Sequence, residues 1–392
     1  MRGSYDVVIV GGGVIGSAIA YFLADAADFD GTVLVVERDP SYAGGSTALS
    51  AGSIRQQFST PENIEISKFG AVFLNEIGDR LAVDGEAPRI DFHAHGYLFL
   101  ADPAALPILQ RNHDIQRAHD CAVVLLTPDE LKDRFPWLNV DGLGGGSLGL
   151  ANEGWFDPYS LLQAFRRKAR ALGVDYAADE AVGLKLAASR VVAVQLAAGG
   201  RIACGTVVNA AGPRAATVAA MAGLDLPVRP RKRCVFVFDC RDELPGHPLL
   251  INSDGVYCRP EGASYICGVS PPPDRDPDCL DYEVDYSLFE DIVWPSLAHR
   301  VPAFEAIKPG RAWAGHYAYN TFDQNAVLGP HPEVANFHFA NGFTGHGLQQ
   351  SPAVGRATME RIVHGAYRSL DLSRLDYTRI AAGAPVVELN IV

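Results

Sequence analysis

The sequence predicts an α/β fold built around a parallel sheet, and three features near its start predict it. A run of β-branched residues at 7–10 is typical of a strand buried on both faces, as parallel sheets require. Gly11, Gly13 and Gly16 follow in the spacing G-x-G-x-x-G. A second apolar run, at 33–36, ends at Glu37, about twenty residues past the last glycine. This pattern predicts a Rossmann-like βαβ unit that binds a dinucleotide.

Each glycine of the motif has a separate structural role. The first allows a tight turn, the second lets the backbone approach a pyrophosphate, and the third lets the next helix pack against the strand. We expect that helix to begin near Val14 and Ile15, so that its free N–H groups face the phosphates. Glu37 stands where the motif places an acid that binds the ribose hydroxyls. The alternative is a glycine-rich turn in an ordinary βαβ unit.

The composition describes a chain with a large core and an acidic surface. Of its 392 residues, 48% are hydrophobic and 20% are charged, so a large core is expected. The net charge of −13 argues against nucleic acid or an anionic membrane as a partner. The basic cluster at 229–233 leads into an apolar run, which favours a solvated strand entrance over a docking patch.

The cysteines and histidines indicate neither disulfides nor a metal site. The seven cysteines are odd in number and form no C-x-x-C, which favours free thiols in a reducing, cytoplasmic compartment. The first strand begins at once, leaving no room for a signal segment. No apolar run reaches the ~18–20 residues of a membrane helix. His93 and His95 have no third ligand at suitable spacing, so we predict no metal.

The remaining segments predict a discontinuous domain with a second domain inserted into it. A second glycine-rich loop, at 342–347, lies far from the first in sequence, yet both are suited to the same ligand. We therefore expect a dinucleotide-binding domain from residues 1–82, 150–225 and 325–392, and an α+β substrate domain with an antiparallel sheet from 83–149 and 226–324. Predicted helices are 63–81, 129–135, 158–172 and 351–364, and strand-rich segments are 90–100, 181–208, 228–270 and 336–340.

Several motifs resemble those of flavin-dependent amine and amino-acid oxidases, such as sarcosine oxidase, glycine oxidase, dimethylglycine dehydrogenase and D-amino acid dehydrogenases. The likeness covers nearly the whole chain. A closer likeness is to mitochondrial FAD-dependent oxidoreductases that act in the assembly of respiratory complex I, and it is carried by residues 53–59, 319–325 and 345–350. The family motifs are residues 6–16, 35–38, 45–47, 96–98, 207–213 and 342–348.

The resemblance implies that the dinucleotide is FAD. In relatives, the positions of Glu37 and Arg38 meet the adenosine, and the main chain of Val182 meets the adenine edge. The N–H groups of the second loop would point at the flavin N1–C2=O region, where negative charge develops on reduction. The implied cofactor contacts are Gly11, Gly13, Val14, Ile15, Gly16, Glu37, Arg38, Ser46, Thr47, Val182, Ala211, Gly212, Gly342, Gly345, His346, Gly347, Leu348 and Gln349.

Departures from the family pattern predict noncovalent FAD. Relatives that attach the flavin use a cysteine in the segment matching 313–323, or a histidine after the Ser-Thr pair; here the segment has no cysteine, and Ala48 and Leu49 follow the pair. The segment at 264–268 lacks the lysine that promotes reaction with oxygen in sarcosine oxidase, which favours a dehydrogenase. The arginine that many relatives place within 313–323 is also absent.

The resemblance implies oxidation of the C–N bond of a small amino acid or N-methyl amino acid, by hydride transfer to flavin N5. Arg55 aligns with the arginine that holds the substrate carboxylate in sarcosine oxidase, and Gln349 replaces that enzyme's partner lysine. Tyr257 and Arg259 correspond to the substrate wall, and His346 is a candidate flavin-facing donor. The alternatives are that Arg55 is a surface charge and that His346 only holds the backbone.

Two other function classes stay open. A nicotinamide-dependent dehydrogenase would share the first motif but leave the loop at 342–347 without a role. A flavoprotein scaffold that assists respiratory-complex assembly, with little or no catalysis, agrees with the closer likeness. The expected partners are a small amino-acid-like substrate and an electron acceptor or respiratory-chain partner.

Overall fold

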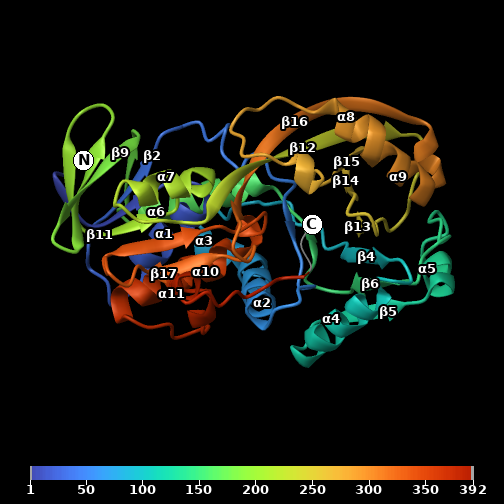
Figure 1. Ribbon diagram of the computed structural model, residues 1–392, viewed down its shortest axis with the longest axis horizontal. Helices are drawn as coiled ribbons and strands as arrows, with labels where there is room; N and C mark the ends of the chain where they lie inside the picture. The colour runs from blue at the N-terminus through green and yellow to red at the C-terminus, as the bar shows by residue number, and fades with distance from the viewer. Residues whose placement is uncertain (1, 390–392) are drawn as a thin grey trace.

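The structure, a computed structural model, describes residues 2–389, which form two eight-stranded sheets side by side (Figure 1). The first sheet runs β17-β18-β11-β1-β2-β8, and β10 and then β9 continue from β11 as an antiparallel extension. Its strands are β1 (Ser4–Val10), β2 (Val33–Glu37), β8 (Asp175–Ala178), β9 (Ala181–Ala187), β10 (Arg190–Leu196), β11 (Arg201–Asn209), β17 (Val327–Pro330) and β18 (Phe337–Asn341).

The centre of this sheet is parallel. On β1, Val8 lies opposite Leu34 of β2 on one side and Val207 of β11 on the other. All three side chains are fully buried, as expected of strands covered on both faces. The predicted parallel, Rossmann-like sheet is confirmed.

Two helices, α1 (Val14–Asp25) and α10 (Gly347–His364), lie against strands of the first sheet and pack against each other. Helix α6 (Pro158–Ala171) packs on α1, and α2 (Pro61–Asn75) packs on α10. At Gly355 a Cβ atom would lie 2.9 Å from the Cβ atom of Ala18, so this glycine permits the close α1–α10 approach. The predicted start of α1 is correct, whereas α10 begins four residues before the predicted position, inside the glycine-rich loop.

The second sheet is antiparallel except between β13 and β4, which run parallel. Its order is β16-β12-β15-β14-β13-β4-β6-β5, and β12 and β16 extend from it toward the first sheet (Figure 1). Its strands are β4 (Tyr97–Ala101), β5 (Val123–Leu126), β6 (Gly145–Gly149), β12 (Val228–Cys240), β13 (Leu249–Ile251), β14 (Tyr257–Glu261), β15 (Ser264–Gly268) and β16 (Ile307–Asn320).

Two segments differ from the sequence-based expectation. Of the predicted strand-rich segment 90–100, only β4 is a strand of the sheet; the residues before it are irregular apart from a bridge between His93 and Trp155. The predicted helix 63–81 is two helices, because the chain turns at Glu76. The remaining elements include α3 (Ile77–Leu81), α4 (Leu106–Ala118), α5 (Pro128–Arg134), α7 (Ala215–Ala220), α8 (Tyr286–Leu288), α9 (Trp294–Arg300), α11 (Thr378–Ala381), β3 (Ser53–Ile54) and β7 (Gly154–Trp155).

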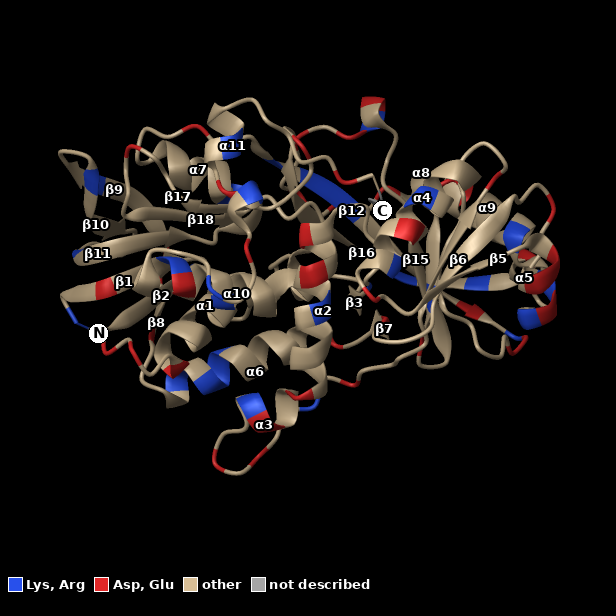
Figure 2. Cartoon of the chain, turned by 90° about the horizontal axis from the view of Figure 1, so that it is seen from below, with Lys and Arg blue, Asp and Glu red and all other residues tan. Residues whose placement is uncertain are grey.

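Acidic and basic residues are spread over the molecule, and β12 carries a conspicuous basic stretch (Figure 2). Within residues 2–389, no helix has the length and apolar character needed to cross a membrane.

Candidate active site

A cavity of about 440 Å³ opens where β1 and β2 end, and it reaches the second sheet. Its wall includes Gly11 and Gly13 from the first glycine-rich loop, together with Gly345 and Gly347 from the second. Tyr257 of β14 lines the same cavity. The carboxyl ends of parallel strands are where α/β sheets bind ligands. Folding therefore brings the two glycine-rich loops to one site.

The first loop has the close approaches that its spacing predicts. A Cβ atom on Gly11 would lie 2.4 Å from the oxygen of Ala210, and one on Gly16 would lie 1.9 Å from the oxygen of Gly11. Gly16 thus allows α1 to pack against the turn and stays outside the cavity wall. Gly13 differs, because a Cβ there would approach nothing closer than Thr47 Oγ1, at 3.6 Å. Its main chain faces the cavity beside Val14 and Ile15.

The Glu37 carboxylate lies at the end of β2 in the cavity wall, next to Arg38. Its Oε2 accepts a hydrogen bond of 2.7 Å from the Gly12 N–H, and its Oε1 accepts one of 2.8 Å from the Asp39 N–H. These bonds hold the carboxylate against the first loop, where a ribose would bind.

Two hydroxyls predicted to meet the cofactor also line the cavity. Thr47 Oγ1 accepts a hydrogen bond of 3.2 Å from the Val14 N–H, and therefore covers part of the N-terminus of α1. Ser46 Oγ donates a bond of 2.7 Å to the main-chain oxygen of His316. Both side chains thus connect the segment at 45–47 to the elements on either side of it.

The predicted adenine side of the cavity lies beside the end of β11 and the start of β9. Ala211 and Gly212 line it, and a Cβ on Gly212 would have nothing within 4 Å. Val182 is 51% exposed and lies just outside the wall, which Ala181 and the two residues before it form instead. Successive side chains of a strand point to opposite faces, so the side chain of Val182, the second residue of β9, points outward. A main-chain contact between Val182 and the adenine edge stays a prediction.

The second loop presents its main chain to the cavity through Gly345, Gly347 and Leu348, whereas Gly342 and His346 lie behind the wall. The Tyr317 ring packs on Gly345, where a Cβ atom would lie 2.6 Å from the ring. Thr344 has a φ of 48° and is held by hydrogen bonds from its N–H to the oxygen of Ala318 and from the Asn320 N–H to its Oγ1.

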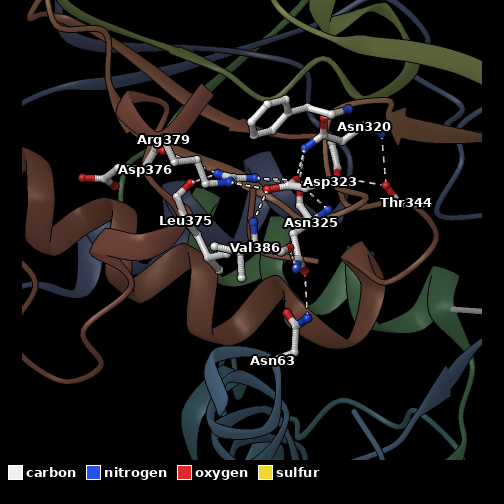
Figure 3. Close-up of polar contacts among 11 residues, drawn as sticks. Asn63, Asn320, Asp323, Asn325, Thr344, Leu375, Asp376, Arg379 and Val386 are labelled. Carbon is white, nitrogen blue, oxygen red and sulfur yellow. Dashed lines mark hydrogen bonds and ion pairs between the residues drawn. The ribbon is translucent and has the colours of Figure 1, made fainter. Parts of the chain in front are cut away.

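A buried polar network holds this loop from behind (Figure 3). Asn320 Nδ2 donates to Asp323 Oδ1 at 2.8 Å, and Asp323 forms a two-pronged ion pair with Arg379. Asn63 Nδ2 donates to Asn325 Oδ1 at 2.8 Å, which joins α2 to the same network. The motif at 319–325, which carried the closer family likeness, is thus a support of the second loop. Sequence reasoning did not assign it this position.

Arg55 is fully buried behind the cavity rather than exposed on the surface. Its Cζ lies 4.0 Å from the centre of the Phe58 ring, its Nη1 donates to the Gln57 oxygen, and its Nη2 lies 3.1 Å from His346 Nε2. A guanidinium group only donates, so His346 Nε2 accepts and the neutral ring carries its proton on Nδ1. Burial, with the Arg55 charge, lowers the pKa of His346 well below its ordinary value.

Gln349 and Glu153 complete the layer behind the cavity. Gln349 Oε1 accepts a bond of 2.9 Å from the Arg55 N–H. Glu153 accepts bonds from the Gln56 N–H and from Gln57 Nε2, and its burial raises its pKa to about 7. A contact between Arg55 and a substrate carboxylate stays a prediction, because in this structure its guanidinium faces protein atoms.

Tyr257 and Arg259 lie on the same side of β14, but only Tyr257 lines the cavity. Arg259 is 4% exposed, and its Nε donates to the oxygen of Ala51 at 3.0 Å. Its Cζ lies 5.4 Å from the centre of the Trp155 ring. Arg259 therefore braces Ala51, which is itself part of the wall.

The residues present fit a dinucleotide. Gly13 and Gly212 leave room for a pyrophosphate against the main chain, the N-terminus of α1 points to the same place, and Glu37 stands at the ribose position. The second loop then offers main-chain N–H groups to the far end of the ligand. This fold and site define an oxidoreductase that binds a flavin dinucleotide.

The chain belongs to the FAD dependent oxidoreductase family, whose model matches residues 6–361. It is 47% identical to FAD-dependent oxidoreductase domain-containing protein 1 of Xenopus laevis, over 99% of this chain and 85% of that protein. It is 28% identical to the mitochondrial dimethylglycine dehydrogenase of Rattus norvegicus, over 95% of this chain and 44% of that protein. The crystal structure of L-proline dehydrogenase from P. horikoshii superposes with a TM-score of 0.87 at 27% identity, covering 98% of this chain and 100% of that one.

Proposed function

We propose that this FAD-dependent oxidoreductase oxidises the C–N bond of a small amino acid or N-methyl amino acid. The observation that carries the proposal is the continuity of the cavity, which joins the dinucleotide motif at Gly13 to Tyr257 on the antiparallel sheet. A small substrate between these walls would lie beside the second loop. Two of the similar proteins are named as dehydrogenases of dimethylglycine and of L-proline, which are amino acids with a tertiary and a secondary amine. These names support the proposed substrate class.

When bound, FAD would supply a two-electron acceptor for a hydride from the carbon next to the amine nitrogen, so that the substrate would become an iminium cation for hydrolysis by water. The protein's contribution is placement and shielding of a neutral amine. We propose that Tyr257 contacts the substrate, because it alone of the five predicted catalytic residues lines the cavity. Arg55, His346 and Gln349 would then act from behind, by fixing the second loop.

The predicted division into domains fits this proposal. The strands of the first sheet all fall within residues 1–82, 150–225 and 325–392, and those of the second sheet within 83–149 and 226–324. We propose that the first set binds FAD and the second forms the substrate wall. A cytoplasmic location also stays a prediction; the seven cysteines are free thiols, which suits a reducing compartment.

The test is an anaerobic screen in which loss of the oxidised flavin absorbance reports substrate. The panel contains sarcosine, dimethylglycine, L- and D-proline, 4-methylaminobutanoate and the common D-amino acids. We expect one or more of them to bleach the flavin, and dithionite to bleach it in every sample as the control. If dithionite reduces the flavin and no amine does, the substrate class is wrong and a scaffold role in respiratory-complex assembly gains support.

A further inference from the structure

The cavity wall contains an arginine on the substrate side that the sequence interpretation left in a solvated cluster. Arg233 lies on β12 of the second sheet and lines the cavity together with Tyr257. Its Cζ lies 5.0 Å from the centre of the Tyr317 ring. Since that ring packs on Gly345, the Arg233 charge lies one aromatic ring away from the second glycine-rich loop.

The other two arginines of the described cavity wall lie away from the second sheet. Arg38 follows Glu37 at the end of β2, and Arg214 follows the close-approach residue Gly212. Both therefore border the dinucleotide part of the cavity. Among the arginines of the described cavity wall, Arg233 is the one that lies on the second sheet, which carries the proposed substrate wall.

The planar fork of Arg233 already holds a carboxylate. Its Nη1 and Nη2 donate to Asp276 Oδ1 and Oδ2 at 2.8 and 3.0 Å, a bidentate geometry. The Arg233 and Asp276 side chains are 10% and 14% exposed, so the pair is largely shielded from water. The Arg233 Nε is buried without a hydrogen-bond partner, which leaves one donor of the group unused.

Asp276 belongs to a segment that covers part of the cavity. We call residues 271–285, between β15 and α8, the strap. Leu280 and Tyr282 of the strap line the cavity, and the Tyr282 hydroxyl donates to the oxygen of Gly44 at 2.7 Å. Side-chain ion pairs add to its attachment to β12: Asp278 with Arg229 and Arg231 at 3.9 and 3.3 Å, and Asp281 with Lys232 at 2.8 Å.

We propose that Arg233 binds the carboxylate of the substrate, and that Asp276 occupies its fork until the substrate displaces it. The inference rests on the proposed function for its substrate class. A substrate carboxylate presents the same two oxygens as Asp276. The Arg233 guanidinium therefore has a carboxylate partner both before and after the substrate binds. The other strap ion pairs are partly exposed and individually weak, so they permit local movement of the Asp276 side chain.

The experiment measures binding to the oxidised FAD-loaded protein, without turnover. Acetate and pyrrole-2-carboxylate are compared with acetamide and pyrrole-2-carboxamide, by calorimetry and by the shift in the flavin spectrum. For the wild type we expect each carboxylate to bind about tenfold tighter than its amide. Arg233→Gln should weaken carboxylate binding about ten- to a hundredfold and leave amide binding and FAD content unchanged. Arg233→Lys should recover part of the preference.

Asp276→Asn tests whether Asp276 competes with the ligand carboxylate for Arg233. Because Arg233 itself is kept, the result does not depend on whether the Arg233 variants fold. Removing the internal carboxylate should tighten carboxylate binding by about tenfold, because the fork is no longer occupied in the free protein. Asp278→Asn is the matched control: it removes the same charge from the strap but does not face Arg233, so it should leave both affinities unchanged.

The outcomes separate this inference from the proposed function. Equal wild-type binding of carboxylate and amide, binding of neither, or an Arg233→Gln variant with the wild-type preference overturns the Arg233 assignment even if an amino acid reduces the flavin. An Asp276→Asn variant with unchanged affinity overturns the competition. If the preference depends on Arg233 but no amine reduces the flavin, the carboxylate site stands and the oxidation proposal fails.

Discussion

Asp323 and Arg379 form a fully buried ion pair, with Nε 2.7 Å from Oδ2 and Nη2 2.9 Å from Oδ1. Their side chains are 0% and 4% exposed. Because Asp323 also binds Asn320, and the Asn320 N–H donates to Thr344, the pair connects α11 to the second glycine-rich loop. Such a pair is costly to break, since the remaining charge is left without compensation in a low dielectric.

We predict that Arg379→Met lowers the free energy of unfolding by about 3–5 kcal/mol, because Asp323 keeps its buried charge. Urea denaturation of the FAD-loaded protein measures it. Arg167→Met is the control: its side chain is 50% exposed and lies 3.7 Å from that of Glu86, which is 81% exposed, so we expect a loss below about 1 kcal/mol. Similar losses in the two variants would contradict the prediction.

We predict that Glu37→Ala weakens FAD binding about ten- to a hundredfold, since a ribose hydroxyl pair and the Gly12 N–H lose their acceptor, at about 1–3 kcal/mol. Fluorescence titration of the apoprotein with FAD gives the dissociation constant. Glu86→Ala, at a side chain 81% exposed, should leave that constant unchanged. An unchanged constant for Glu37→Ala would remove Glu37 from the ribose site.

We predict that the purified protein is yellow and releases intact FAD on acid precipitation. The reason is chemical: no cysteine lies within 313–323, and Ala48 and Leu49 replace the histidine that other relatives use for attachment. Absorbance of the supernatant and of the redissolved pellet measures the partition. Flavin that stays with the pellet would mean a covalent link at another residue.

We predict that the free energy of unfolding depends on pH partly through Glu153, and that Glu153→Gln removes this contribution. Burial raises the folded-state pKa of Glu153 to about 7, above the ordinary carboxyl range. The folded protein therefore binds this proton more tightly than the unfolded chain, so the stabilisation is complete at low pH and is lost as the pH rises through about 7. Between pH 5 and pH 8 this group should lower the free energy of unfolding by about 2.5 kcal/mol.

The measurement is urea denaturation of wild type and Glu153→Gln at several pH values. Other titrating groups cancel in the difference between the two proteins, so the difference isolates Glu153. A difference that does not change with pH would show that Glu153 keeps one charge state across the range.

Much of the fold was readable from the sequence, because its signals are local. A run of β-branched residues followed by Gly11, Gly13 and Gly16 has few alternatives to strand, turn and helix. As this spacing predicts, β1 ends at Val10 and α1 begins at Val14. Both glycine-rich loops were recognised as parts of one site, and they do line one cavity. Family motifs extended this to the identity of the cofactor.

The side-chain assignments behind the cavity depended on the tertiary structure. Arg55 aligns with a carboxylate-binding arginine, but its contact with His346 joins chain segments almost three hundred residues apart. The pairing of Arg233 with Asp276 likewise depends on where the strap crosses β12. Sequence periodicity reports which face a residue takes along its own strand or helix. Which charged group lies opposite is decided by packing between distant segments, and that packing determines what each buried charge must bind.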